Sequence, residues 1–550
     1  MKLAACLVFA ALLLQSQQPA GDQCFVAGRV VNAANGGPVR RVRLILRRVD
    51  NPSGGSGSPA AYTSLSDDHG KFAMKGMEPG KYEFSAQRAG FAETSYGARR
   101  PGRAGITLSL DAGQQLTGVL FRLTPHAVIA GRILDQDGDP VEGVQVRTER
   151  YRYTMGKRQL VPSGYASTDD LGEYRLFGLA PGRYYLEATY RSFGTLMRAT
   201  RPASKAVEES FVPTYYPGTI DIGNATAIEL APGAQLRGMD FTLFKARTVH
   251  VRGRVSLPPD VKGQMVMITL SPRGTFIWDF MRRARVLDPQ GTFDVTDVRP
   301  GAYTLSAQAQ QDKTSYSAHQ QLEVSGSHIE NVVLNLSPGS EMEGQLRFEG
   351  QKPPSLTEIQ IQLDDPEPSR TRFGATPGGE VREDGSFTLS HVGSEIYRVR
   401  AHGLAAGYYL KSVRIGDDEL KETGIDTTRG ATGPLLLTIS DKAGQIEGVV
   451  LNAKQKPTAG AAVVLVPETK KRERYDDFKE VTTDQYGRFT LKTIEPGEYK
   501  LFAWEDMEPG EYMDPDFLKP VEARGYPVTI HEGSRESAEL KLIPANPAPQ

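Results

Sequence analysis

Cysteine is almost absent from this chain of 550 residues, which has only Cys6 and Cys24. Cys6 lies in an N-terminal segment that we expect to be removed, so the mature chain keeps one thiol and forms no internal disulfide. Its folded units must therefore be stabilised by packing alone. We expect Cys24 to be an inert, partly buried thiol, with an intermolecular bridge as the alternative.

Long apolar runs are also missing, apart from the segment from Leu3 to Leu14. This run follows a lysine, precedes a polar stretch ending in Pro-Ala, and is too short to span a bilayer. The pattern is typical of a secretory signal peptide, which we place at residues 1–20. We therefore expect export to the periplasm, the cell surface or the medium, with no integral membrane segment after signal removal.

Neither sign of charge predominates in the chain. It has 65 Lys and Arg residues against 66 Asp and Glu residues, which leaves a formal net charge of -1. Nucleic acids and anionic lipid surfaces are bound mainly by basic fields, and this composition provides none. We therefore exclude nucleic acid from the expected partners.

The motifs of catalysis are missing as well. None of the eight histidines begins an H-x-x-E pair or belongs to H-E-x-x-H, the spacings that hold a catalytic zinc ion. The sequence also has no G-x-S-x-G elbow, no phosphate loop and no dinucleotide fingerprint. We therefore predict a protein that is not an enzyme and that holds neither a cofactor nor a catalytic metal.

One acidic run is similar to the start of a calcium loop. Asp135, Asp137 and Asp139 alternate around a glycine, as the first ligands of such a loop do. The position that should carry the bidentate acid is Val146, and the run lies where two strands need a connecting turn. We favour the plain turn, with a metal site as the alternative.

What the chain does contain is one pattern repeated five times. A glycine is followed two residues later by an aromatic residue and, ten residues after that, by a tyrosine. A Pro-Gly pair precedes the tyrosine except in the fourth case, which has Ser394 and Glu395 there. Spacing held so rigidly indicates that one small β unit has been copied. We number the copies 1 to 5 by their aromatic and tyrosine residues: Phe72 and Tyr82, Tyr174 and Tyr184, Phe293 and Tyr303, Phe387 and Tyr397, Phe489 and Tyr499.

The parts of this pattern are those of a hairpin followed by a strand. The Pro-Gly pair suits the central positions of a type II turn. A large residue and an alanine follow each tyrosine at period two, as in Leu305 and Ala307, which predicts a strand with one core-facing side. An acid just before the turn glycine can accept hydrogen bonds from the turn's amides. These acids are Asp68, Asp170, Asp288, Asp384 and Asp484.

Each copy also opens with a glycine-containing strand and closes with a pair of strands, of which copy 4 clearly keeps only the last. About seven strands in about 100 residues are typical of a small two-sheet sandwich. We therefore predict an all-β chain of five tandem small β-sandwiches after a signal peptide, with a long insertion in the second and a divergent fourth. The predicted boundaries are 21–125, 126–247, 248–338, 339–440 and 441–550.

In these motifs the chain resembles the bacterial carboxypeptidase regulatory-like domain family, which is related in fold to transthyretin-like and Cna B-type sandwiches. The resemblance covers about residues 24–545 and rests on the G-R-V opening, the D-x-x-G-x-F turn and the P-G-x-Y-x-L-x-A strand taken together. It implies an accessory or binding module that has no catalytic residues of its own and is grouped with carbohydrate-binding-like folds.

A function particular to this chain is expected where the copies differ. Copy 2 carries the longest segment after its tyrosine, roughly residues 191–224, which includes Arg198, Arg201, Tyr215 and Tyr216. Exposed aromatic rings stack on sugars and arginines bind carboxylates, so these four side chains are candidate binding residues. The alternative is that the tyrosines hold the segment against its own sandwich.

The two tryptophans are the other aromatic residues of interest. Trp278 lies in a connection of copy 3 and is the fifth candidate binding residue, whereas Trp504 continues the alternation of the last tyrosine strand and is expected at a sheet end. Packing within a core or between domains is the alternative for both.

Three functions are compatible with the sequence. The first is a structural or protein-binding scaffold at the cell envelope, the second is a carbohydrate-binding protein that uses its sandwich loops, and the third is an accessory subunit of a peptidase. The expected partner is accordingly an envelope protein or a glycan. An exposed aromatic platform would favour the glycan, and extended surfaces between domains would favour the scaffold.

Overall fold

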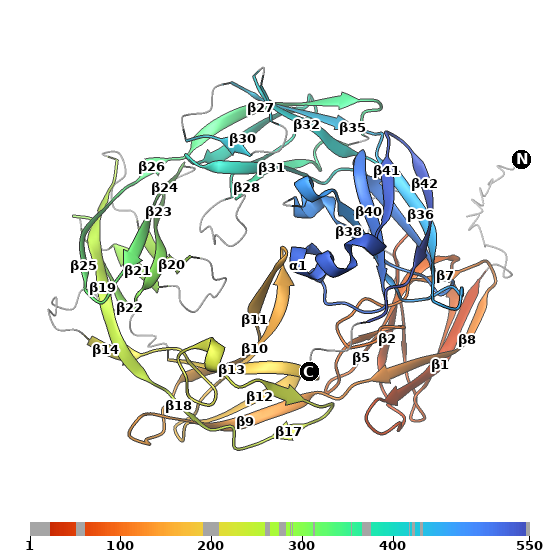
Figure 1. Ribbon diagram of the computed structural model, residues 1–550, viewed down its shortest axis with the longest axis horizontal. Helices are drawn as coiled ribbons and strands as arrows, with labels where there is room; N and C mark the ends of the chain where they lie inside the picture. Colours follow the sequence, from red (N-terminus) through yellow and green to blue (C-terminus); the bar gives the residue numbers. More distant parts are fainter. Residues whose placement is uncertain are drawn as a thin grey trace, which may run out of the picture. The chain divides into compact units, whose positions relative to one another are not determined.

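The computed structural model describes residues 23–545, except residues 51–60, 191–207, 259–264, 274–281, 287, 289, 312–313, 354, 366–375, 417, 421–423, 429–432 and 473. The predicted signal peptide lies outside the described residues. The chain forms two compact units, Met1–Pro125 and His126–Gln550. Almost all regular structure is β-strand (Figure 1), and α1 (Pro515–Leu518) is the one α-helix of the described residues. Among those residues no helix is long and apolar enough to cross a membrane.

Copies 1, 2, 3 and 5 share one topology, which confirms the predicted tandem β-sandwiches. In one sheet the opening strand lies between an antiparallel strand and the parallel closing strand of its copy. In the second sheet the tyrosine strand lies between the second strand of the copy and a later strand. Figure 1 shows these two sheets face to face in copy 3.

Copy 1 forms the first compact unit. Its first sheet has the order β4 (Lys71–Met77), β1 (Cys24–Asn32), β8 (Gln115–Leu123), and its second sheet contains β3 (Ala61–Leu65), β2 (Arg43–Arg48), β5 (Gly80–Gln87), β6 (Thr94–Ser95) and β7 (Leu108–Leu110).

Copy 2 opens the second unit. One sheet contains β12 (Glu173–Leu179), β9 (Ala127–Leu134), β17 (Gln235–Leu236) and β18 (Phe241–Thr242), and the other contains β11 (Lys157–Ser167), β10 (Val144–Thr154), β13 (Gly182–Tyr190), β15 (Thr214–Tyr215) and β16 (Ile228–Leu230). The short 3-10 helix η2 (Ile222–Asn224) precedes β16.

Copy 3 follows the same plan. One sheet contains β22 (Thr292–Val298), β19 (Lys245–Ser256), β25 (Ile329–Asn335) and the added β14 (Glu208–Phe211), and the other contains β21 (Arg282–Val286), β20 (Val266–Pro272), β23 (Gly301–Gln311), β24 (Thr314–Val324) and β26 (Ser337–Pro338).

Copy 5 has one sheet of β39 (Arg488–Ile494), β36 (Gly444–Leu451) and β42 (Arg535–Lys541), and a second of β38 (Lys479–Thr482), β37 (Ala462–Pro467), β40 (Gly497–Trp504) and β41 (Tyr526–Ile530). The 3-10 helices are η4 (Thr469–Lys471), η5 (Tyr475–Asp477), η6 (Glu511–Met513) and η7 (Lys519–Arg524). Trp504 ends β40, where it is buried and stacks on Phe502 with ring centroids 5.2 Å apart.

The opening glycine of each copy is required by a close approach between strands. A Cβ atom on Gly28 would lie 2.0 Å from the carbonyl oxygen of Val119 on the parallel closing strand, and one on Gly448 would lie 2.0 Å from that of Ala538. Any larger residue would therefore push the opening and closing strands apart. The repeated glycine thus preserves the parallel pairing that closes the sheet.

The tyrosine strand forms the centre of the core in copies 1, 2, 3 and 5, as predicted. Leu186, Ala188, Leu305 and Ala307 are fully buried. The predicted type II turn before the tyrosine is wrong, however. Type II geometry needs a glycine φ near +80°, whereas the glycines of copies 1, 2 and 3 have φ of 158°, 145° and 156° and already begin the strand.

The tyrosine hydroxyl accounts for the sharp entry into this strand. In copies 1, 2 and 5 it donates to the carbonyl four residues earlier, with distances of 2.7, 2.7 and 2.9 Å. In copy 4, which lacks the Pro-Gly pair, the Tyr397 hydroxyl instead accepts from the Gly393 amide at 2.8 Å. The aromatic side chain therefore fixes the bend that we had assigned to the turn.

The hairpin acids are also partly reassigned. In copies 1 and 2 the carboxylates that accept turn amides belong to Asp67 and Asp169, not to the predicted Asp68 and Asp170. Asp67 and Asp169 each lie three residues before the turn glycine, where one carboxylate oxygen accepts hydrogen bonds from two backbone amides. Copies 3, 4 and 5 use the predicted acids, Asp288, Asp384 and Asp484.

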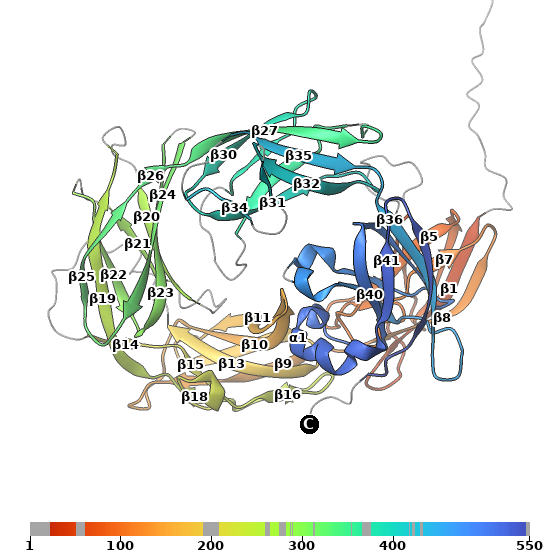
Figure 2. The same ribbon diagram turned by 45° about the horizontal axis from the view of Figure 1, so that its top comes forward.

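Copy 4 departs from the common topology. Its strands follow the order β33 (Asp418–Glu419), β32 (Tyr409–Ile415), β35 (Leu435–Ser440), β27 (Ser340–Glu349), β30 (Ser386–Val392), β29 (Gly378–Glu380), β28 (Gln360–Asp364), β31 (Ile396–His402), β34 (Ile425–Asp426). The strand after the tyrosine strand, β32, does not pair with β31 but with β35, near the other end of this order (Figure 2). Only Ile396 and Tyr397 of β31 pair with β34.

Candidate functional site

The residues predicted to bind a ligand in copy 2 do not form an exposed platform. Tyr215 is 3% exposed in β15, and Tyr216 is half-buried with its ring packed edge-on against Phe241 at 5.9 Å. Both tyrosines hold their segment against its own sandwich, which is the alternative stated from the sequence. Arg198, Arg201 and Trp278 lie outside the described residues.

Tyr215 is buried beside a cluster of charged side chains on β10 and β13. Arg147 is 5% exposed and Glu149 and Glu187 are fully buried, and both carboxylates form ion pairs with the Arg147 guanidinium. Desolvation raises the pKa of Glu149 and of Glu187, while Arg147 opposes the shift. Two acids therefore share one buried cation on the face of this sheet that is turned away from the copy 2 core, because the three residues alternate with the core residues Val146, Leu186 and Ala188.

The acidic run in copy 2 is a plain turn. Asp135 accepts the amides of Asp137 and Asp139 at 2.9 and 3.0 Å with a single carboxylate oxygen. Its side chain is thus used in holding its own loop. Among the described residues, no group of three His, Cys, Asp or Glu side chains is arranged to hold a metal ion.

A cavity of about 420 Å³ lies where copy 4 opens toward copy 5. One wall is β31 and the facing wall is β32, which lie near opposite ends of the nine-strand order, β31 beside β28 and β32 beside β35. Residues of the η5 segment of copy 5 complete the lining. The cavity therefore results directly from the pairing of β32 with β35 instead of with the tyrosine strand β31.

The inner part of this cavity is lined by apolar side chains whose equivalents in the other copies are fully buried in the core. Val399 and Ala401 occupy the positions of Leu186 and Ala188 in the tyrosine strand, yet they are only half-buried. Leu410, Val413 and Leu420 face the same opening and are also half-buried. The exposed edge of the copy 4 core is therefore the apolar half of the site.

The outer part of the cavity is charged and internally paired. Arg400 forms ion pairs with Asp364 at 2.7 Å and with Asp476 of η5 at 3.2 Å. Lys411 bridges Glu349 of copy 4 and Glu532 of copy 5, at 2.6 Å to each. These ion pairs join the two copies around the opening.

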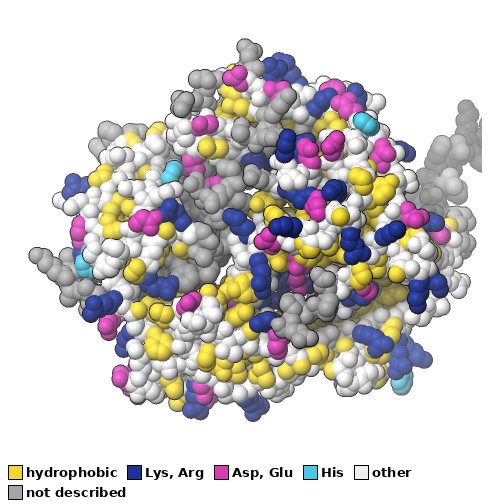
Figure 3. Space-filling model, in the orientation of Figure 1, with side chains coloured by type: hydrophobic (Ala, Val, Ile, Leu, Met, Phe, Trp, Pro, Cys, Tyr) yellow, Lys and Arg dark blue, Asp and Glu magenta, His cyan; other side chains and the backbone are white. Residues whose placement is uncertain are grey.

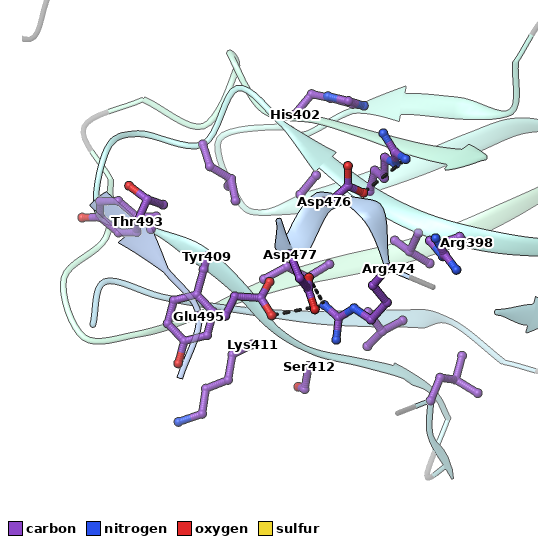
Figure 4. Close-up of a pocket in the computed structure, with 18 of the residues that line it drawn as sticks. Arg398, His402, Tyr409, Lys411, Ser412, Arg474, Asp476, Asp477, Thr493 and Glu495 are labelled. Atoms are coloured by element: carbon purple, nitrogen blue, oxygen red, sulfur yellow. Dashed lines mark hydrogen bonds and ion pairs between the residues drawn. The ribbon is translucent and has the colours of Figure 1, made fainter. Parts of the chain in front are cut away.

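At the copy 5 side, one guanidinium holds two carboxylates (Figure 4). Arg474 lies 3.2 Å from Asp477 and 3.1 Å from Glu495. Desolvation raises the pKa of Asp477 to about 6, with Arg474 opposing and Glu495 reinforcing the shift. This part of the wall can bind polar groups and takes up a proton in mildly acidic conditions.

Two features of the sequence indicate this site, although we assigned no residues to it. The signature of copy 4 has Ser394 and Glu395 in place of Pro-Gly, and its closing strand pair was recognisable only in part. Both mark the copy whose sheets are rearranged. The contribution of the η5 segment has no signal in the repeat pattern, because it depends on how copies 4 and 5 pack.

The family comparison supports the resemblance seen in the motifs. Residues 128–243 match the carboxypeptidase regulatory-like domain family, which confirms the resemblance for copy 2. No curated protein matches the chain.

Solved structures with similar folds are β-rich proteins of low sequence identity. The minor pilin GBS52 of Streptococcus agalactiae is 12% identical, with 44% of this chain and 99% of that chain covered and a TM-score of 0.23. The shaft pilin SpaA of Lactobacillus rhamnosus GG is 13% identical, with 40% and 96% covered and a TM-score of 0.18. The Bacillus anthracis TIE protein is 11% identical, with 76% and 74% covered and a TM-score of 0.15.

Proposed function

We propose that this chain is an exported, non-catalytic scaffold of tandem β-sandwiches that binds a partner protein at the cell envelope. The observation that carries the proposal is the opening in copy 4. The repeated frame of the other copies uses its tyrosines and strand residues in the core, whereas copy 4 leaves apolar strand residues half-buried beside a charged rim.

The surface charge is consistent with recognition by shape and local contacts. Lys and Arg side chains alternate with Asp and Glu over the face shown in Figure 3, without one large field of either sign. A partner is therefore not drawn by long-range electrostatic attraction. Specific contacts at an opening such as the one in copy 4 must then supply the binding.

The proposal is tested by capture of envelope proteins with the full-length chain. Val413→Lys places a charge in the apolar half of the copy 4 opening, and Val333→Lys is the matched control because Val333 is 55% exposed in copy 3. We expect one partner to be retained by the wild type and the control and lost by Val413→Lys. Retention of no envelope protein by any form would refute a protein-binding scaffold.

Carbohydrate binding is a second candidate because copy 2 exposes two aromatic rings on neighbouring strands. Tyr165 of β11 is 79% exposed and Phe177 of β12 is 70% exposed, with the Arg175 guanidinium 5.8 Å from the Phe177 ring centre. Exposed rings of this kind can stack on sugars. A glycan array should show binding that the double variant Tyr165→Ser, Phe177→Ser loses, and an array without any bound glycan would eliminate this candidate.

We also propose that the chain is divided at the boundaries derived from the repeat, namely 21–125, 126–247, 248–338, 339–440 and 441–550. Separate sets of buried side chains support this division, one for each copy. Each sandwich should then unfold as a unit of its own.

A further inference from the structure

The hairpin of β10 and β11 in copy 2 is longer than its counterparts. Its strands have 11 residues each, whereas β2 and β3 of copy 1 have six and five, and β37 and β38 of copy 5 have six and four. Met155 and Gly156 form its tip, with φ of 47° and 68°. Positive φ at both central residues is the type I′ geometry, which matches the twist of a hairpin. The hairpin of copy 2 therefore ends in a tight tip that extends past the length of the equivalent hairpins.

Copy 5 carries a segment of short helices between its tyrosine strand and β41. This segment, residues 505–525, contains η6, α1 and η7. Its Met507, Tyr512 and Leu518 are buried and pack with Trp504 in a second apolar cluster of copy 5. The helical segment is therefore held to copy 5 by a core of its own.

The hairpin tip and the helical segment contact each other, although copies 2 and 5 are not neighbours in the sequence. A Cβ atom on Gly156 would lie 2.6 Å from the carbonyl oxygen of Met513, and one on Gly510 would lie 3.1 Å from the carbonyl oxygen of Tyr153. A glycine on each side thus lets the two backbones approach more closely than a larger residue would permit.

Opposite charges gather on the two sides of this contact. The hairpin residues 150–158 include four Lys and Arg residues and no acid, whereas residues 505–516 include six Asp and Glu residues and no Lys or Arg. Burial raises the pKa of Tyr153 beside the tip, and the charges of Glu511 and Asp514 reinforce the shift. The carboxylates of copy 5 therefore act on the hairpin of copy 2, and the contact joins a basic element to an acidic one.

Copies 2 to 5 are also joined in succession. β14 pairs with β19 where copy 3 begins, Glu395 of copy 4 lies 3.6 Å from His319 of copy 3, and Lys411 links copy 4 to copy 5. The contact between copies 2 and 5 therefore closes the second compact unit on itself. A force applied between copy 2 and copy 5 then passes through this contact and bypasses copies 3 and 4.

We propose that the copy 2 hairpin and the acidic segment of copy 5 form a releasable clasp, which closes copies 2 to 5 into a loop and opens under salt or tension while each sandwich stays folded. The close backbone approach involves the hairpin tip, so the contact is small, but the chain itself keeps the two sides at a high effective concentration. Salt weakens the attraction across the clasp, because the screening length falls from about 10 Å at 0.1 M to about 3 Å at 1 M. The clasp does not depend on the partner that copy 4 binds.

A disulfide across the clasp measures how often it is closed. Tyr153→Cys with Gly510→Cys places two thiols on Cβ atoms that would lie 3.5 Å apart, a separation that a disulfide can bridge. Tyr165→Cys with Gly510→Cys is the matched control, because Tyr165 lies near the opposite end of β11 and is 79% exposed. Cys24 is buried and is retained in both forms. Oxidised glutathione is added to the full-length chain, and non-reducing electrophoresis follows bond formation.

We expect the first cysteine pair to close at least about tenfold faster than the control pair at low salt, and to lose this advantage at about 1 M salt. In the first pair's background, Lys157→Glu with Arg158→Glu should slow closure severalfold. Arg183→Glu removes an exposed cation of β13 and should leave the rate within about twofold. Equal rates for the two cysteine pairs, or a rate that neither salt nor charge reversal lowers, would overturn the clasp.

Small-angle X-ray scattering of the chain without added cysteines tests the release. Its radius of gyration should increase between low salt and about 1 M salt, whereas that of the disulfide-locked form should stay constant. Calorimetry should show that copies 2 and 5 remain folded at both salt concentrations, and unfolding of either copy in high salt would overturn release of a clasp. An envelope partner retained by a chain without a clasp would leave the scaffold function standing.

Discussion

At the scale of single residues, the repeated tyrosine joins two functions in one side chain. Its ring fills the core, and its hydroxyl holds the backbone that enters the strand. Tyr82, Tyr184 and Tyr397 are among the largest fully buried side chains of the described residues. This explains why a tyrosine and not a phenylalanine recurs at the position.

Removal of one such hydroxyl tests the argument. Tyr184→Phe leaves the Ala180 carbonyl without its donor, and we expect a loss of about 1–2 kcal/mol from the free energy of unfolding of copy 2. Tyr165→Phe is the control, because its ring is 79% exposed and its loss should be within about 0.5 kcal/mol. Urea unfolding monitored by circular dichroism provides the comparison, and equal effects of the two variants would contradict the role of the hydroxyl.

The buried Asp477 carboxyl predicts a pH dependence of copy 5. Its pKa in the folded chain is about 6, above the ordinary value near 4, so the folded state binds the additional proton between these pH values. The contribution of Asp477 to the free energy of unfolding of copy 5 is therefore greatest below pH 4. It declines as the pH rises through 6, by up to about 3 kcal/mol. Asp477→Asn should remove this decline.

Trp504 provides the measurement, because it lies in the core of copy 5. In a Trp278→Phe background its fluorescence follows the unfolding of copy 5 in urea between pH 4 and pH 7. Asp476→Asn is the neighbouring control, with its side chain 56% exposed, and should retain the decline. An unchanged pH slope in Asp477→Asn would mean that another group titrates.

At the scale of structural elements, two neighbouring strands of copy 2, β10 and β13, carry the Arg147, Glu149 and Glu187 cluster. Removing one member of a buried charged cluster is strongly destabilising, because the remaining charges then lack an ion-pair partner in a medium of low polarity. The cluster therefore connects β10 to β13 in a manner that depends on all its members.

Arg147→Met should lower the stability of copy 2 by about 3–5 kcal/mol, since it leaves two buried carboxyl groups without a cation. Arg132→Met is the matched control, because the ion pair of Arg132 with Glu173 is about half exposed and contributes at most about 1 kcal/mol. Thermal unfolding of both variants checks the difference. A destabilisation no greater than that of the control would show that the cluster contributes little.

The sequence predicted the elements well where a pattern depended on local chemistry. Turn glycines such as Gly70, with a φ of 74°, and the alternating tyrosine strands appear as expected. The type II turn was wrong because the tyrosine hydroxyl, bonded to the carbonyl four residues earlier, holds the bend, and the repeat pattern gives no indication of that contact. The cavity was not predictable, since it requires β32 to pair with β35 instead of with β31, and copy 5 to supply Arg474 and Asp477.

At the scale of the whole molecule, the repeat separates stability from recognition. Each copy has its own set of buried side chains, so a defect in one core should remain in that copy. The divergent copy 4 is then free to leave part of its core half-buried at a cavity while its neighbours retain the standard frame.

This separation is tested by Tyr303→Ala, which deletes a core ring of copy 3 and should remove about 3–5 kcal/mol from its stability. We expect calorimetry to show one early transition for copy 3 and unchanged transitions for the others, because contacts between sequential domains are usually modest. Tyr165→Phe serves again as the exposed control. A single cooperative transition for the whole Tyr303→Ala variant would contradict independent folding.

The parallel pairing of opening and closing strands also has a mechanical consequence. Because β1 and β8, or β36 and β42, run in the same direction, the chain enters a copy at one end of this pair and leaves it at the other. Tension along the chain therefore pulls the two strands lengthwise past each other, so their hydrogen bonds share the load and do not open one at a time. Each copy is thus built to resist stretching along the chain.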